Sequence, residues 1–360
     1  MRRTWSLLLA VTFALPLGAQ TRLLRQPTVS AREIAFTYGS DVWIVERAGG
    51  VARRLTSTPA VESSPSFSPD GQWVAFTSNR SGVPQVYVVS RDGGDPQRLT
   101  WYPSTSLVRG WTPDGSAVLY ASSRESAPTG FMRLWTVPRA GGPSTRLPAP
   151  WGFNGALSAD GRQLAVDRMT RWDGEWRNYR GGQNTALSIL NLASLDEVKL
   201  PNDARTTDVN PVWSGNKVYF LSDRDYAMNV WSYDPASRAV AQVTRSRDGD
   251  IKWLSAGPDR LAYELDGYVH LLDPANGRSE RVDITVRGDF PWMGARWEDV
   301  STQVTSATLG QTGQRILMEA RGDVWTVPVE HGDARNLSRS SGSADRAAVA
   351  GGAGGARNGG

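Results

Sequence analysis

The sequence predicts an all-β fold made of repeated four-stranded antiparallel sheets. The unit is clearest between Ser66 and Thr100, where short β-branched and aromatic runs alternate with turn signals. One of these turns is Pro69-Asp70-Gly71, in which proline presets φ, the aspartate can hydrogen-bond its own backbone, and glycine tolerates a positive φ. An isolated sheet of this size cannot bury both of its faces, so it requires neighbours of the same kind.

The unit recurs at intervals of about 40 to 55 residues, close to the length of a propeller blade. The central residues of its third strand are, in chain order, Trp43, Tyr87, Trp135, Ser188, Trp231, His270 and Trp325. The first six units predict a six-bladed β-propeller with four-stranded blades. Because the last step is the longest, the seventh unit is expected to be the first blade of a second, truncated propeller.

The two ends of the chain differ in composition from this repeated body. Arg2 and Arg3, the apolar run 5–17 and the small residues before Gln20 have the three parts of a secretory signal peptide, so we assign 1–19 to a signal. The apolar run is too short to be a permanent membrane anchor. At the other end, 339–360 is rich in Gly and Ala without any hydrophobic period, which predicts a disordered tail.

Between these ends the repeat predicts two domains. We assign 20–290 to the six-bladed propeller and 291–338 to a connector and the first blade of a second propeller. The six blades are expected at about 27–56, 66–100, 106–148, 154–201, 209–244 and 252–283. The repeat lapses from Ile284 to Val300, so we expect this stretch to be a connector.

Composition restricts the compartment and the partners. The chain has no cysteine, which excludes a disulfide framework and a lipid-modified N-terminal Cys. Together with the signal, this predicts a periplasmic or secreted protein, with the cytoplasm as the alternative. The formal charge is +4, but 35 basic and 35 acidic residues lie between Gln20 and Ser338. A neutral body lacks the basic footprint of a nucleic-acid-binding protein.

Motifs for several common catalytic sites are absent from the sequence. There is no P-loop, no His-Glu-x-x-His and no Gly-x-Ser-x-Gly. Of the two histidines, His270 occupies an aromatic slot of the third strand and His331 lies in a predicted turn, so a histidine-dependent triad is not expected. The aspartates of the Pro-Asp-Gly turns are expected to be structural. We therefore predict no catalytic, metal or cofactor residue in this chain.

Two groups of residues are candidates for binding peptides. An arginine follows the second strand in several units, and such loops all emerge on one face of a propeller; the members within the six blades are Arg80, Arg124, Arg168 and Arg224. A broken ring of positive charge at the channel mouth would attract carboxylates. The alternative is that each guanidinium bonds loop carbonyls or an adjacent Asp.

The second candidate is the long loop of the fourth blade, 168–182, which replaces a tight turn and is rich in Arg and aromatic residues. Its candidate peptide-binding residues are Arg177, Tyr179 and Arg180. The alternative is a packed connection that covers one end of the propeller.

Several of these segments, in this order, resemble the N-terminal part of tricorn-type proteases. They are the recurrent Ser-Pro-Asp-Gly blades, Trp-Arg-Asn-Tyr-Arg-Gly-Gly at 176–182, Leu-Ser-Asp-Arg at 221–224, Glu-Ala-Arg-Gly-Asp-Val-Trp-Thr-Val-Pro at 319–328, Arg-Asn-Leu at 335–337 and Gly-Ser-Ala-Asp-Arg at 342–346. The resemblance covers Gln20 to Arg346. Single blades are less specific, because they are shared with TolB propellers and prolyl-oligopeptidase-like peptidases.

The resemblance implies a six-bladed propeller followed by a seven-bladed one, a PDZ domain and a serine-protease domain, with the propellers filtering and channelling peptides. By that comparison the chain holds the first propeller and the opening blade of the second, and no catalytic residue can be carried over. The chain itself is expected to be inactive on peptides, and a homo-oligomer is an expectation for the full-length protein only. Because the blade pattern stops at Arg346, we expect a frameshift or truncation there. The competing hypothesis is a TolB-like envelope propeller that binds a protein partner.

Overall fold

The computed structural model describes residues 21–126, 131–168, 186–202, 206–247, 249–290, 299–338 and 344–348. The chain divides into two compact units, with the boundary between Gly288 and Asp289. The assigned signal 1–19 and most of the tail 339–360 lie outside the described residues.

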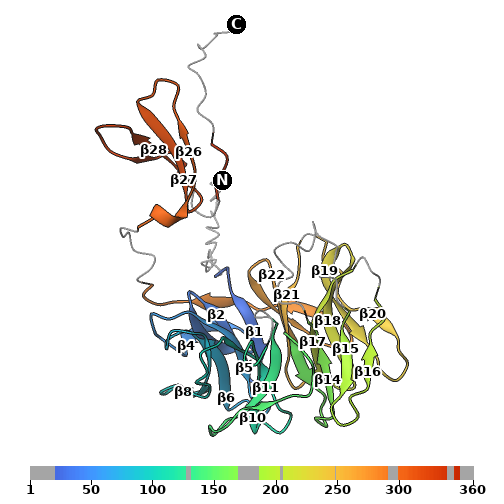
Figure 1. The fold of residues 1–360 in the computed structure, drawn as a ribbon. Coiled ribbons are helices and arrows are strands. Elements are labelled where there is room, and N and C mark those ends of the chain that lie inside the picture. Colours follow the sequence, from blue (N-terminus) through green and yellow to red (C-terminus); the bar gives the residue numbers. More distant parts are fainter. Residues whose placement is uncertain are drawn as a thin grey trace, which may run out of the picture. The chain divides into compact units, whose positions relative to one another are not determined.

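Within the described residues, unit 1 contains six antiparallel four-stranded meanders, which we number as sheets one to six in chain order (Figure 1). Sheets one and two consist of β1 (Arg25–Val29), β2 (Glu33–Tyr38), β3 (Asp41–Glu46), β4 (Gly50–Arg54), β5 (Glu62–Phe67), β6 (Trp73–Ser78), β7 (Gln85–Ser90) and β8 (Gln97–Arg98). Sheets three and four consist of β9 (Ser106–Trp111), β10 (Ala117–Ser122), β11 (Arg133–Pro138), β12 (Thr145–Arg146), β13 (Gly155–Leu157), β14 (Gln163–Val166), β15 (Ser188–Asn191) and β16 (Glu197–Lys199). Sheets five and six consist of β17 (Asp208–Ser214), β18 (Lys217–Asp225), β19 (Ala227–Tyr233), β20 (Val240–Gln242), β21 (Lys252–Ala256), β22 (Leu261–Leu265), β23 (Tyr268–Leu272) and β24 (Ser279–Arg281).

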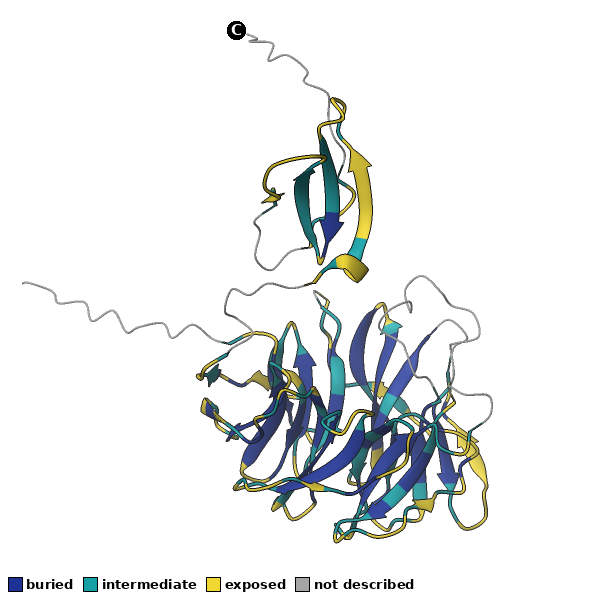
Figure 2. Ribbon diagram, turned by 60° about the vertical axis from the view of Figure 1, so that its left-hand side comes forward, coloured by how far each residue is buried: buried dark blue, intermediate teal, exposed yellow. Residues whose placement is uncertain are grey.

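The six sheets form a ring. Their first strands contact one another in chain order, and β21 contacts β1. The hydrophobic clusters lie between successive sheets: one joins Ile44 of sheet one to Phe76 of sheet two, and another joins Val86 of sheet two to Tyr120 of sheet three. Figure 2 shows the strands of the ring as mostly buried. Each sheet thus covers a neighbour's apolar face, and the predicted all-β propeller architecture is confirmed.

The predicted Pro-Asp-Gly turn forms between β5 and β6. Asp70 Oδ1 accepts hydrogen bonds from the Ser68 hydroxyl and from the Gln72 N–H, while Gly71 adopts a φ of 69°. These hydrogen bonds hold the pKa of Asp70 below its usual value. Asp114 and Asp160 make the same pattern in the next two sheets, which confirms the structural role expected for these aspartates.

Sheet six packs directly against sheet one. Ser255 Oγ donates a hydrogen bond of 2.7 Å to Pro27 O, and Arg47 forms a bidentate ion pair with Asp259 at 2.9 and 2.7 Å. The backbones approach closely here, because a Cβ added at Gly257 would lie 2.5 Å from Val29 O. Packing and side-chain bonds thus join the first and last sheets, and a backbone hydrogen bond of 3.0 Å from Leu24 N to Gly267 O adds to them.

One segment differs from the sequence prediction. Ile284–Val286, expected to be connector, forms β25 and pairs in parallel with β4 as a fifth strand of sheet one. Gly50 N donates to Asp283 O at 2.8 Å, and Thr21 N donates to Ile284 O at 3.3 Å. The prediction failed because three residues carry too little pattern to reveal a partner strand more than 200 positions earlier.

Unit 2 contains a 3₁₀ turn (Ser301–Gln303) and one four-stranded antiparallel sheet in its described part. The strands are β26 (Val304–Leu309), β27 (Arg315–Ala320), β28 (Asp323–Pro328) and β29 (Arg335–Asn336). Apolar side chains such as Ile316, Met318 and Trp325 remain partly exposed. Figure 2 shows the strands of this sheet as mostly intermediate or exposed. A single sheet of this size has little core of its own.

None of the helical segments in the described part of the chain has the length and apolar character needed to cross a bilayer.

Candidate functional site

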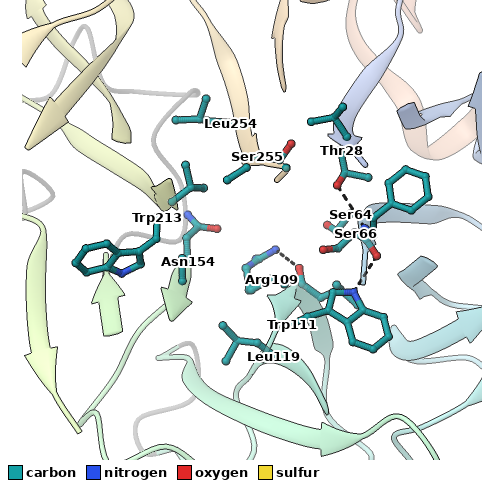
Figure 3. Close-up of a pocket in the computed structure, with 18 of the residues that line it drawn as sticks. Thr28, Ser64, Ser66, Arg109, Trp111, Leu119, Asn154, Trp213, Leu254 and Ser255 are labelled. Atoms are coloured by element: carbon teal, nitrogen blue, oxygen red, sulfur yellow. Dashed lines mark hydrogen bonds between the residues drawn. The ribbon is translucent and has the colours of Figure 1, made fainter. Parts of the chain in front are cut away.

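The six first strands of unit 1 surround a central channel that contains a cavity of about 330 Å³. Residues of β1, β5, β9, β13, β17 and β21 all line it. Figure 3 shows Ser66, Arg109 and Ser255 from these strands, and Asn154 just before β13, arranged around an open centre. A volume of this size lies at the lower end of the range for ligand pockets.

The lining is shaped by irregularities in the first strands. Several of these strands have a bulge or other register shift near the channel, and non-glycine residues with positive φ occur at Gln26, Ser64, Asn210 and Trp253. Ser64 N donates to Gln26 Oε1 of the preceding sheet at 2.7 Å. Bulges re-aim side chains and free backbone groups, and here those groups bond the adjacent sheet.

Sheets five and six are joined in a similar way, by two hydrogen bonds between one side-chain amide and the backbone of one residue. Leu254 N donates to Asn210 Oδ1 at 3.0 Å, and Asn210 Nδ2 donates to Leu254 O at 2.9 Å. The channel wall is thus held by bonds between neighbouring sheets.

Arg109, on β9, is the only charged side chain among the described residues that line this cavity. Its Nε donates to Phe153 O at 2.8 Å, its Nη1 donates to Val108 O at 3.0 Å, and its guanidinium carbon lies 4.2 Å from the centroid of the Phe153 ring. Burial lowers the pKa of Arg109 to about 10. The side chain therefore stays cationic at neutral pH.

A buried carboxylate lies in the wall beside this position. Asp167 Oδ1 accepts a hydrogen bond from Asn154 N at 2.9 Å, and Oδ2 accepts from Asn154 Nδ2 and Asn210 N, both at 2.8 Å. Burial raises the pKa of Asp167 to about 6 despite these bonds. Asp167 is a link between sheets four and five, and it does not line the cavity.

Two of the predicted ring arginines are paired with buried carboxylates of their own sheets. Arg80 pairs with Glu62 and stacks 4.8 Å from the centroid of the Tyr87 ring. Arg224 bonds Asp208 through Nη2 at 2.6 Å and Nε at 3.3 Å. Glu62 and Asp208 are both buried, so these two guanidinium groups satisfy charges that would otherwise be unpaired.

The other two members are paired with more exposed acidic groups. Arg124 Nε lies 3.3 Å from Glu125 Oε1, and its guanidinium stacks between Tyr102 and Trp135 at 4.4 and 4.5 Å from the ring centroids. Arg168 Nη2 donates to Glu197 Oε1 at 2.8 Å and lies 5.7 Å from the centroid of the Trp151 ring.

The four arginines therefore form separate ion pairs, each held by groups of its own sheet, instead of one shared cluster. Arg177, Tyr179 and Arg180, the candidates of the fourth-blade loop, lie outside the described residues. His270 packs face to face with Tyr263, at 5.0 Å between ring centroids, and burial lowers its pKa. This contact confirms the structural role expected for His270.

Sequence reasoning missed Arg109, although the repeat contains a signal for it. Pro65 lies four residues before the proline of the first Pro-Asp-Gly turn, and Arg109 lies four residues before Pro113 of the next. An alignment of the second and third units on their Pro-Asp-Gly turns places Arg109 opposite Pro65, and so reveals a charged residue in place of a proline. Among the described residues, no group of three or more His, Cys, Asp or Glu side chains is arranged to hold a metal ion.

Comparison with known proteins assigns the family. Residues 21–278 match the model of the tricorn protease N-terminal beta propeller domain. Tricorn protease homolog 1 of Streptomyces coelicolor is 29% identical over 333 residues, which are 90% of this chain and 30% of the relative. The tricorn protease homolog of Saccharolobus solfataricus is 26% identical over 88% of this chain and 29% of its own length. The chain thus spans about 30% of the length of these relatives.

Solved structures agree on the fold. The crystal structure of the tricorn protease superposes with a TM-score of 0.67 at 21% identity, covering 89% of this chain and 31% of that one. A putative TolB from Agrobacterium tumefaciens gives a TM-score of 0.52 at 20% identity, covering 64% of this chain and 83% of that one. The family match extends over most of unit 1, so the chain belongs to the family of tricorn protease N-terminal β-propeller domains.

Proposed function

We propose that this propeller binds peptides in its central channel as the non-catalytic, N-terminal part of a tricorn-like protease. The observation that carries the proposal is the channel itself, where first strands of all six sheets surround a cavity of about 330 Å³. Cleavage would belong to parts of a longer protein beyond this chain, as the name of the tricorn protease relatives implies for those proteins.

The lining supports a peptide as the ligand. Small and polar side chains such as Ser66, Asn154 and Ser255 line the cavity, while the rings of Trp111 and Trp213 pack between the sheets. Hydroxyl and amide groups can bond a peptide backbone without reading its sequence. The cavity is too small for a folded domain but accommodates an extended segment of chain.

The loop face adds a second part to this proposal. Arg124 and Arg168 lie beside the exposed aromatic side chains Tyr102 and Trp151, which are 43% and 42% exposed. Arginine and aromatic side chains are enriched in binding surfaces. We therefore propose that these two arginines guide acidic peptides toward the channel. For Arg80 and Arg224 the same role requires competing with a buried carboxylate.

The experiment narrows the channel without changing its charge. Ala156 lines the cavity, so Ala156→Phe should obstruct it, whereas Ala156→Ser should not. Binding of short blocked peptides to the full chain is measured by calorimetry. We expect Ala156→Phe to weaken binding at least about tenfold at an unchanged melting temperature, and Ala156→Ser to preserve it. Equal peptide affinity in both variants would refute a channel site.

We also propose that the protein is exported to the periplasm or the exterior, on the basis of the signal-like segment 1–19. Expression of the full gene followed by mass measurement of the protein in the periplasmic fraction tests this. Retention of residues 1–19 in a cytoplasmic product would contradict export.

A second candidate function is docking of a protein partner, as the TolB-like alternative predicts. The observation in its favour is the exposed Trp101, which is 73% exposed and has Arg98 stacked 4.2 Å from its ring centroid. Trp101→Ser should then abolish capture of an envelope protein by the full chain while leaving peptide binding unchanged.

A further inference from the structure

Arg109 differs from the residues at the same place in three other first strands. In sheets one, two and five, the pairing of the first strand with the second shifts register and then resumes at Thr28, Ser66 and Val212. The residue immediately before each of these is a proline, namely Pro27, Pro65 and Pro211. Sheet three places Arg109 there, next to Gly110, which pairs with Leu119 in the equivalent register. Sheet three thus has a long cationic side chain where these three sheets have a rigid neutral ring and sheet six has Trp253.

The channel wall fixes the Arg109 guanidinium but does not use all of its N–H donors. Nε and Nη1 each donate to a backbone carbonyl, of Phe153 and Val108, and one face of the group stacks on the Phe153 ring. Within the described part of the chain, the Nη2 group of Arg109 has no hydrogen-bond acceptor. Figure 3 shows the side chain beside Asn154 at the edge of the open space. Its orientation is thus set by the protein, with donors left for a ligand.

The nearby carboxylate does not take up these donors. Both oxygens of Asp167 accept hydrogen bonds from Asn154 and Asn210, and the ion pairs of the described residues do not include one between Asp167 and Arg109. None of the residues that line the cavity is Asp or Glu. Among the described residues that line the cavity, an oxyanion meets one cation and no carboxylate, while the charge of Asp167 acts on Arg109 from within the wall.

We propose that Arg109 is the binding residue for a carboxylate group of a peptide in the central channel. This inference rests on the proposed function, because it places the peptide in the same cavity. A guanidinium presents its N–H groups to a carboxylate in a planar fork, and such charge-assisted bonds are stronger than neutral ones. The carboxylate has two sources in a peptide, its C-terminus and its Asp or Glu side chains, and both present the same pair of oxygens.

The experiment compares three N-acetylated tetrapeptides on the full chain by calorimetry. The first is tetra-alanine with a free C-terminal carboxylate, the second is its C-terminal amide, and the third is an amide with one Glu in place of Ala. The wild type should bind the first, the third or both at least about tenfold more tightly than the neutral amide. The peptide that gains affinity identifies the source of the carboxylate.

Variants assign the preference to Arg109. Arg109→Met should weaken binding of the carboxylate peptide at least about tenfold more than binding of the neutral amide, so that the preference disappears, and Arg109→Lys should retain part of it. Arg139→Met is the matched control, because Arg139 also stacks on a ring, 4.7 Å from the Trp73 centroid, but does not line the cavity. Melting temperatures establish that each variant is folded.

Three outcomes overturn the inference. If the wild type binds the three peptides equally, or if the preference survives in Arg109→Met, Arg109 does not bind a carboxylate. The proposal that the channel binds peptides would still stand in both cases. If no peptide binds and Ala156→Phe changes nothing, the proposed function fails together with this inference.

Discussion

Arg109 is anchored to Phe153 twice, by a 2.8 Å hydrogen bond from its Nε to the carbonyl oxygen and by stacking of the guanidinium on the ring. Arg109 lies on β9 of sheet three and Phe153 lies just before β13 of sheet four, so the contact joins neighbouring parts of the ring. It also orients the only charged side chain among the described residues that line the cavity. This relationship connects the stability of the ring with the chemistry of its channel.

The first prediction concerns the buried partner of Arg224. Asp208 is 0% exposed, and replacing Arg224 by Met leaves it unpaired. We expect the free energy of unfolding to fall by about 3 kcal/mol or more, measured by urea denaturation. Arg224→Met combined with Asp208→Asn should recover part of the loss, and no recovery would show that the guanidinium acts through packing alone. Peptide affinity measured on the same variants tests whether Arg224 also contributes to binding.

The second prediction concerns the pH dependence of stability. The pKa of Asp167 is raised from 3.8 to about 6 in the folded protein. The folded state therefore holds this proton more tightly than the unfolded state, so the stabilisation is present below pH of about 4 and is lost as the pH rises through about 6. The contribution amounts to about 3 kcal/mol.

Asp167→Asn should remove this slope, which is checked by urea midpoints at pH 4, 5, 6 and 7. Asp160→Asn is the control of opposite sign, because hydrogen bonds lower the pKa of the exposed Asp160, whose stabilisation is lost as the pH falls. If the Asp167→Asn variant kept the wild-type slope between pH 4 and 6, a different group would be responsible.

The third prediction concerns closure of the ring. A Cβ at Gly257 would lie 2.5 Å from Val29 O and 2.7 Å from the Val29 Cγ1. Because the nearest atom is backbone, Gly257→Ala should force sheets one and six apart and cost about 1 to 3 kcal/mol of unfolding free energy. The control is Gly161→Asn, at a turn with φ of 69° and open space, which asparagine tolerates. Equal melting temperatures of Gly257→Ala and wild type would contradict a tight junction.

The fourth prediction concerns β25. Ile284 is 0% exposed although it lies in a three-residue strand, so Ile284→Ala should cost about 2 to 4 kcal/mol. Hydrogen exchange should increase in β4, its parallel partner, more than in β8, the outer strand of the next sheet. Unchanged protection of Gly50 to Ala52 in the variant would mean that β25 does not stabilise sheet one.

The candidate site was predictable only in part. The ring arginines were found from their position after the second strand, but their acidic partners were not all visible, because Glu62 and Asp208 lie 18 and 16 positions away from Arg80 and Arg224. Arg109 was missed because its signal appears only when two blades are aligned on their turns, and because the alignment alone does not show what the arginine contacts. Its orientation depends on a hydrogen bond to Phe153, which lies 44 positions later in the chain.

The sequence by itself determined the repeat, the turns and the apolar strands of each sheet, because these depend on side-chain periodicity and on hydrogen bonds between near neighbours such as Ser68 and Asp70. Only the tertiary structure decided that Ile284 to Val286 joins sheet one, that Arg80 and Arg224 neutralise buried carboxylates, and that Arg109 faces a common channel. These outcomes require residues far apart in the chain to meet, and burial, which sets the strength of each charge interaction, exists only once the ring has formed.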